Sequence, residues 1–165
     1  MIPITEFRTF PVSSAEPFDR TVQGTVQGDG DSLDLGTVDT TDEAQDTPVK
    51  VVWWRVSDMR GNTEVSNIRV WLEGAEEITG KLSWYMDITD TWTTGKTTVQ
   101  VRTGIPGTAP LLEPSANLTA RGGGAITGTG DADVSRYIYI TGNIGVDVPT
   151  GACVDLKLRV MFDYH

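Results

Sequence analysis

The feature that most constrains this chain is a two-residue alternation of apolar and polar side chains near its end, over residues 154–164. The even positions include Leu156, Leu158, Val160 and Phe162, whereas most odd positions carry charged or polar residues. Successive side chains of a β-strand point to opposite faces, so this period predicts a strand with one face on a core. Such one-sided burial is common in antiparallel sheets.

Shorter β patterns recur along the chain, at residues 67–72, 82–88, 97–102 and 134–140, and turn residues separate them. Residues 49–56 contain the run Val-Val-Trp-Trp and are apolar on both faces, which predicts a central strand. No segment shows the period of a long amphipathic helix. The predicted fold class is therefore all-β, an antiparallel β-sandwich that is jelly-roll-like.

Charge divides the chain into two unlike parts. Of the formal net charge of −10, −8 falls on residues 1–47, which hold ten acidic and two basic side chains. This part has weak strand patterns at residues 4–10, 21–27 and 32–38, and its polar composition is typical of a flexible segment. We predict an extended acidic N-terminal arm over residues 1–47 and a β-sandwich domain over residues 48–165. The arm should lie against its own sandwich, a sister subunit or another protein, and its deletion should leave the sandwich folded.

A second segment without periodicity extends from residue 103 to about residue 125 and is rich in glycine and proline. Roughly twenty residues are long for a loop in a compact domain, and such loops are commonly functional. The apolar pair Leu111 and Leu112 lies in this segment, so we expect it to contact a partner surface.

The acidic balance argues against nucleic acid as a partner and against binding to an anionic membrane surface. The chain has no run of about 18 or more apolar residues that would predict a membrane span. Its first residues lack the basic start and apolar centre of a secretory signal, so we expect synthesis in a cytoplasm without cleavage.

No catalytic motif stands out. The only histidine is the final residue, His165, and the only cysteine is Cys153, so neither nucleophilic catalysis nor a zinc cluster is supported. Residues 122–124 are three glycines, but they lack the strand and helix that flank a phosphate-binding loop. We therefore predict no enzyme activity and no cofactor.

Two Asp-x-Asp pairs leave a metal alternative open. Asp29 with Asp31, and Asp131 with Asp133, resemble fragments of calcium-binding loops, although neither completes the loop with a terminal glutamate. Tight turns favour the same residues and are the stronger interpretation. We predict no metal site, with structural calcium as the weaker alternative.

The aromatic side chains are the most informative candidates for a binding surface. Adjacent strand residues face opposite sides, so Trp53 and Trp54 cannot share one core, and Trp71 should face away from its apolar neighbours. A second face of the sheet would thus carry tryptophan and tyrosine. That face predicts a subunit interface, a buried face covered by the arm, or a platform for stacking sugars. The predicted interface residues are Trp54, Trp71, Tyr85, Trp92, Tyr137, Tyr139, Leu111 and Leu112.

The order of these segments carries a resemblance. The stretch SNIRVWL at residues 66–72 is followed by the Trp84-Tyr85 strand and a glycine- and proline-rich segment. DADVSRYIYI at residues 131–140 and a turn at residues 142–151 then lead into the final strand. This arrangement resembles the small β-sandwich head-decoration (cement) proteins, and related virion structural proteins, of tailed viruses.

The resemblance implies a protein on the outer surface of a capsid that clamps neighbouring major capsid proteins. It also implies a homo-oligomer, with a trimer favoured, and an N-terminal arm that contributes contacts. The predicted function is a non-enzymatic virion structural protein, made in the host cytoplasm, that stabilises contacts between capsid subunits. The alternatives are a carbohydrate-binding β-sandwich module, with Trp54 or Trp92 stacking on sugars, and another virion component such as a head–tail adaptor, tail protein or minor capsid subunit.

Overall fold

The computed structural model describes residues 1–27, 31–73, 82–99, 103–104, 115–148 and 156–165. This part of the chain contains β-strands and short 3₁₀ turns and no α-helix, so the all-β prediction is confirmed. Accordingly, none of its segments is a helix with the length and apolar character needed to cross a membrane.

Strand β4 (Lys50–Asp58) is the central strand that its Val-Val-Trp-Trp run predicts. It lies between β1 (Ile4–Phe10) and β8 (Tyr137–Ile144) in the main sheet. Trp53 and Trp54 are both fully buried, and they belong to two different apolar clusters. The prediction that they face opposite sides of the sheet is therefore correct.

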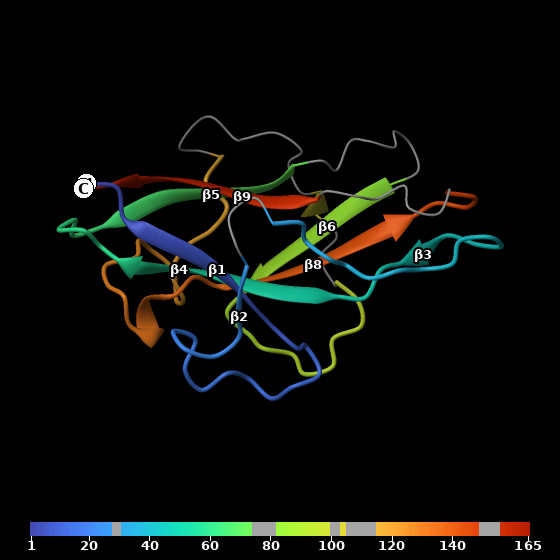
Figure 1. Cartoon of the computed structure of the whole chain (residues 1–165), viewed down its shortest axis with the longest axis horizontal. Coiled ribbons are helices and arrows are strands. Elements are labelled where there is room, and N and C mark those ends of the chain that lie inside the picture. Colours follow the sequence, from blue (N-terminus) through green and yellow to red (C-terminus); the bar gives the residue numbers. More distant parts are fainter. Residues whose placement is uncertain (28–30, 74–81, 100–102, 105–114, 149–155) are drawn as a thin grey trace.

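The strands form two antiparallel sheets (Figure 1). In the main sheet the order is β2 (Thr25–Gln27), β1, β4, β8, β6 (Leu82–Thr89) and β7 (Thr103–Gly104), and β3 (Gln45–Asp46) pairs with one end of β8. The second sheet consists of β5 (Val65–Glu73) and β9 (Lys157–Tyr164). This two-layer arrangement is sandwich-like.

The larger core lies between the two sheets. The alternating residues that the sequence predicts to face inward do so: Trp84 and Met86 on β6 are buried, as are Val70 on β5 and Leu158 on β9. Full burial of each such side chain contributes about 1.5–3 kcal/mol. The core residues that share this environment include Val52, Trp54, Val56, Ile68, Leu72, Ile138 and Ile140.

Gly142 makes room for one of the core tryptophans. It lies directly opposite Trp84 in the pairing of β8 with β6. A Cβ atom at Gly142 would be 2.3 Å from Cζ3 of Trp84, which is far inside contact distance. The indole of Trp84 can therefore pack against β8 only because this position is a glycine.

Residues 1–47 are part of the β body, which corrects the expectation of an arm that can be removed from it. β1 covers the predicted residues 4–10, pairs along its length with β4 and buries Phe7. β2 and β3 also belong to the main sheet. Of the alternatives for this segment, the structure shows contact with its own sandwich.

Other predicted strands differ from the structure. Residues 32–38 form no strand, but Leu33 and Leu35 are buried, and the Leu33 N–H donates to the Leu156 carbonyl at 2.6 Å. Residues 97–99 form no strand either, and residues 100–102 lie outside the described residues. In both segments the short apolar pattern produces burial without a neighbouring strand to pair with.

The role of β1 can be tested with two alanine substitutions. Phe7→Ala should lower the free energy of unfolding by about 3 kcal/mol, because it empties a buried position between the sheets. Ile4→Ala on the same strand is the control, since Ile4 is 42% exposed, and its effect should stay within about 0.5 kcal/mol. Urea unfolding followed by circular dichroism measures both. Equal, small effects would show that β1 is not a core strand.

Candidate functional site

The second face of the main sheet is covered by the chain's own residues 11–24 and 91–95. Beneath them, Trp53, Tyr137 and Tyr139 are fully buried, and Phe10 and Trp92 pack against the cluster. The ring centroids of Trp92 and Tyr137 are 5.2 Å apart, and those of Trp53 and Tyr137 are 6.1 Å apart. Tyr137 and Tyr139 are therefore interior residues. This corrects their prediction as interface residues and agrees with the alternative of a buried face covered by the N-terminal segment.

Arg20 fastens the loop of residues 11–24 onto this face. Its guanidinium donates to Asp131 Oδ2 at 2.9 Å and to the Tyr137 hydroxyl at 2.9 Å. Its backbone N–H donates to Asp131 Oδ1 at 2.6 Å, and its carbonyl accepts from Nε1 of Trp53 at 2.9 Å. Hydrogen bonds of this charge-assisted kind are roughly twice as strong as neutral ones. A single side chain thus connects the loop to the sheet and to the turn at Asp131.

The two aspartates of the Asp131–Asp133 turn already have partners. Asp131 accepts both hydrogen bonds from Arg20, and Asp133 accepts from the Gly130 N–H at 3.1 Å. In the described part of the chain, no three His, Cys, Asp or Glu side chains converge as metal ligands would. Asp29, from the other Asp-x-Asp pair, lies outside the described residues. The geometry at Asp131 is that of an ion-paired turn.

The hydroxyl of Tyr137 is shared by three partners. It donates to Glu16 at 2.8 Å and accepts from Arg20 at 2.9 Å and Arg121 at 3.0 Å. Burial raises the pKa of Tyr137, and the hydrogen bond to Glu16 raises it further, to about 12. The side chain therefore stays protonated at neutral pH. Its hydroxyl holds the loop of residues 11–24 on the sheet through Glu16 and Arg20, and this contact is called the lock below.

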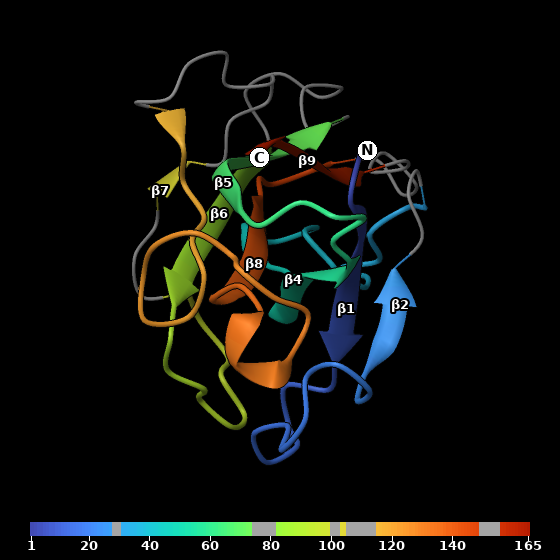
Figure 2. The same cartoon turned by 90° about the vertical axis from the view of Figure 1, so that its left-hand side faces the viewer.

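A groove of about 680 Å³ lies along one edge of β9. Phe7 on β1, Val26 on β2 and Trp54 on β4 line it from the main sheet. Figure 2 shows β1 and β2 on the same side of the molecule as the N-terminus, beneath β9. The remaining lining residues are Ile2, Pro3, Thr5, Glu6, Gln27, Trp71, Glu73, Leu158, Arg159, Val160 and Phe162.

Exposed apolar side chains surround this groove. Ile2 is 65% exposed and Val26 47%, and Met161 on the outer face of β9 is 38% exposed. Sequence reasoning missed these residues. Met161 carried a signal, because it is an apolar residue among the charged odd positions Lys157, Arg159 and Asp163. Exposed apolar residues that gather in one place mark interaction sites, so this edge is the candidate functional site.

The charged groups at the rim of the groove are already paired. Glu6 accepts from Arg8 and from Arg55, each at 2.8 Å, and Arg159 donates to Glu73 at 2.6 Å. Burial favours the neutral form of Glu6, but the hydrogen bonds from Arg55 and Arg8 outweigh it and hold its pKa below the usual range. An apolar centre with a polar rim is the usual anatomy of a protein–protein contact.

The other predicted interface residues are distributed as follows. Trp71 is half-buried and lines the groove, whereas Trp54 lies fully buried beneath it. Tyr85 is half-buried on β6, away from the groove-lining set. Nε1 of Trp92 donates to the Ser14 carbonyl at 3.0 Å, which holds this ring under the loop. Leu111 and Leu112 lie outside the described residues.

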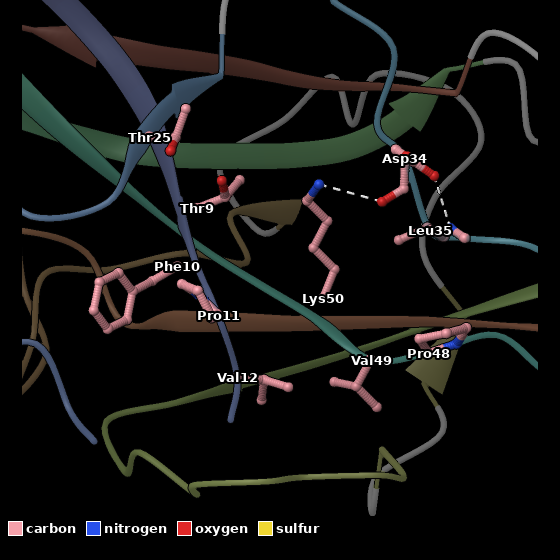
Figure 3. A pocket seen from close by; sticks show the side chains of 11 residues that line it. Thr9, Phe10, Pro11, Val12, Thr25, Asp34, Leu35, Pro48, Val49 and Lys50 are labelled. Atoms are coloured by element: carbon pink, nitrogen blue, oxygen red, sulfur yellow. Dashed lines mark hydrogen bonds between the residues drawn. The ribbon is translucent and has the colours of Figure 1, made fainter. Parts of the chain in front are cut away.

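A smaller pocket of about 380 Å³ lies at the other end of β1 (Figure 3). There Lys50 donates to the Asp34 carbonyl at 3.2 Å, and the Gly36 N–H donates to the Asp34 carboxylate at 2.8 Å. Its lining includes one carboxylate, that of Asp34, and no histidine or cysteine. The Lys50 ammonium is thus bound to the Asp34 backbone carbonyl, and the Asp34 carboxylate to the Gly36 N–H.

No known protein family, curated protein or solved structure matches this chain. The functional conclusion therefore comes from the residues described above.

The lock at Tyr137 gives a prediction for alkaline pH. The pKa of Tyr137 is raised in the folded state, so its contribution to stability is complete below pH 10 and is lost as the pH rises towards about 12. In Tyr137→Phe, the free energy of unfolding should fall less steeply than in the wild type between about pH 10 and pH 12. At neutral pH it should cost about 1–3 kcal/mol, because Arg20, Arg121 and Glu16 lose a partner.

Urea unfolding at neutral and alkaline pH measures both effects. Tyr164→Phe is the matched control, because Tyr164 is 38% exposed and lies outside the cluster. A Tyr137→Phe variant with the wild-type stability at neutral pH would contradict the assignment of this hydroxyl as a lock.

Proposed function

We propose that this protein is a non-enzymatic virion structural protein, a capsid decoration protein that stabilises contacts between neighbouring capsid subunits. The proposal also includes a jelly-roll-like sandwich and a homo-oligomeric state on the capsid surface. The observation that carries the proposal is the apolar groove along β9, with exposed apolar side chains at its rim.

The groove suits a contact with another protein. Its lining is contributed by both sheets, so a partner seated there would hold the two layers of the sandwich together. The tryptophan that lines it, Trp71, is of the residue type most often found at the energetic centre of interfaces. A specific contact buries about 1,000 Å² or more, which the groove together with its exposed rim would help to supply.

The charge distribution also supports a protein partner. The acidic residues Asp31, Asp34, Asp39 and Asp42 are exposed on the segment that follows β2. Hydrogen bonds from the Thr41 side chain and backbone lower the pKa of Asp39, so this carboxylate stays ionised. A negatively charged surface favours encounter with basic surfaces of a partner and disfavours nucleic acid.

A carbohydrate-binding module is the second candidate function, and Trp71 is the observation that favours it. The two tryptophans first considered for sugar stacking are less suitable, because Trp54 is fully buried and the indole N–H of Trp92 is bound to Ser14. Another virion role, such as a head–tail adaptor, tail protein or minor capsid subunit, would use the same groove. Glycan-array binding that is lost in Trp71→Ala would favour the carbohydrate-binding module over both virion roles.

The decoration role predicts a specific loss of capsid binding. Trp71→Ala should weaken binding to capsids prepared without this protein by about 2 kcal/mol, roughly thirtyfold in Kd. Phe18→Ala is the matched control, because Phe18 is 82% exposed and does not line the groove. Cosedimentation over a range of protein concentrations measures both. A wild-type protein that does not sediment with capsids would overturn the proposal.

A further inference from the structure

Beyond Leu156, whose carbonyl accepts from the Leu33 N–H at 2.6 Å, the outer edge of β9 has no strand paired with it among the described residues. β9 pairs with β5 on one side, and no other strand in the described part of the chain pairs with its second side. Glu64, just before β5, and His165, just after β9, exchange two backbone hydrogen bonds, at 3.2 and 3.0 Å. The backbone N–H and C=O of His165 therefore point towards β5. Backbone groups alternate along a strand, so those of Leu158, Val160 and Phe162 point away from β5. These three residues offer three donors and three acceptors to a new neighbour.

The groove lies directly beside this edge. Leu158, Val160 and Phe162 line it, and so do outer-face residues of the small sheet, Trp71 and Arg159. A strand added to β9 would therefore place alternate side chains on the two sides of the small sheet, with the inward ones over Phe7, Val26 and Trp54. A third strand added to the small sheet at this edge would occupy the groove.

The floor of the groove contains an unsatisfied donor. Trp54 is fully buried, and its indole Nε1 has no hydrogen-bond partner among the described residues. A buried donor without a partner costs about 1–3 kcal/mol, and native proteins rarely leave one. Because Trp54 has no exposed surface, an acceptor on an incoming segment would reach this group only if the packed Phe162 ring moved aside.

We propose that the groove binds an extended peptide segment of a partner protein, which adds to β9 as an antiparallel third strand of the small sheet. The outward side chains of β9 run from Lys157 and Arg159 through Met161 to Asp163. Arg159 is paired with Glu73 and Asp163 with Arg69, so charges on the segment would extend existing ion pairs. The complementary segment carries a basic residue opposite Asp163, an apolar residue opposite Met161 and acidic residues opposite Arg159 and Lys157, with apolar residues between. This inference rests on the proposed function for the source of the segment, a neighbouring structural protein.

A single strand fits this place better than a second copy of the whole protein. β1 and β2 continue the main sheet beyond β4, and residues of both line the groove. A partner that reaches the edge of β9 must therefore enter the groove between this edge and those two strands. The regular spacing of donors and acceptors along β9 matches an extended backbone, which is the basis of recognition by strand addition.

A peptide with the sequence of residues 156–165, LKLRVMFDYH, is the probe for this site. Aligned antiparallel with Met161 opposite Met161, it places its arginine opposite Asp163 and its aspartate opposite Arg159. Its apolar even positions then face the groove. The control peptide has the same side chains but carries N-methyl groups at the positions of Val160 and Phe162, whose N–H groups would bind the edge of β9. Fluorescence anisotropy should show saturable binding of the probe and at least tenfold weaker binding of the control.

Two protein variants locate the binding site. Val26→Glu places a charge in the groove, and Val26 is 47% exposed, so the fold should tolerate it. Val22→Glu is the matched control, since Val22 is 65% exposed and does not line the groove. Probe affinity should fall at least tenfold for Val26→Glu and stay unchanged for Val22→Glu. Equal binding of the probe and the N-methylated peptide, or no binding of the probe, would overturn the inference.

Further measurements distinguish a partner strand from other occupants of the groove. They also test the strand-addition site separately from the decoration role. Self-association of the protein in analytical ultracentrifugation that Val26→Glu abolishes would replace the partner strand with a second copy. Competition of the probe by glycans would replace it with a carbohydrate. Capsid binding that Val26→Glu leaves unchanged would overturn the strand-addition site and leave the decoration role standing. Probe binding without capsid binding would support the strand-addition site and overturn the decoration role.

Discussion

The structure depends on the burial of β4 on both of its faces. Val52 and Trp54 face one apolar cluster, whereas Val51 and Trp53 face the other, and all four side chains are fully buried. A strand of this kind is stable only where two separate layers exclude water from it. One layer is the small sheet of β5 and β9, and the other is irregular chain, residues 11–24 and 91–95, held by Arg20 and Trp92. The position of every other element follows from this double requirement.

The two layers close their faces to different extents. The irregular layer reaches into the sheet through Arg20, Glu16 and Trp92, and it leaves Tyr137 and Tyr139 fully buried. The small sheet has two strands over a main sheet of seven, so it stops short of β1 and β2. Among the described strands only β5 pairs with β9, and the groove beside the other edge of β9 is the direct result of this mismatch. The candidate site therefore exists because the small sheet is narrower than the main sheet, and it does not depend on any single residue.

Local periodicity was sufficient to predict the strands that have one buried face, such as β6 and β9, and the central position of β4. It also indicated a strand at residues 4–10, the position of β1, but not the pairing of β1 with β4. Acidic composition carries no information about a pairing partner some fifty residues away, such as Trp54 for Phe7. The sequence left the face of Tyr137 and Tyr139 open between an interface and burial under the arm, because the loop that covers it has no recognisable period. The groove was beyond prediction, since it lies beside an edge of β9 with which no described strand pairs. Among the predicted interface residues that the structure describes, Trp71 alone lines the groove without being fully buried.

The connection between Arg20 and Asp131 has a consequence for how the chain is made. These residues are 111 positions apart, and the strand that completes the small sheet, β9, begins at Lys157. Neither cover of β4 can therefore close until most of the chain has been synthesised. At the usual rate of translation the interval between β4 and β9 lasts about 5–20 s. During that time both tryptophans of β4 are on a nascent chain without their final neighbours, which is the period in which chaperones would act on this protein.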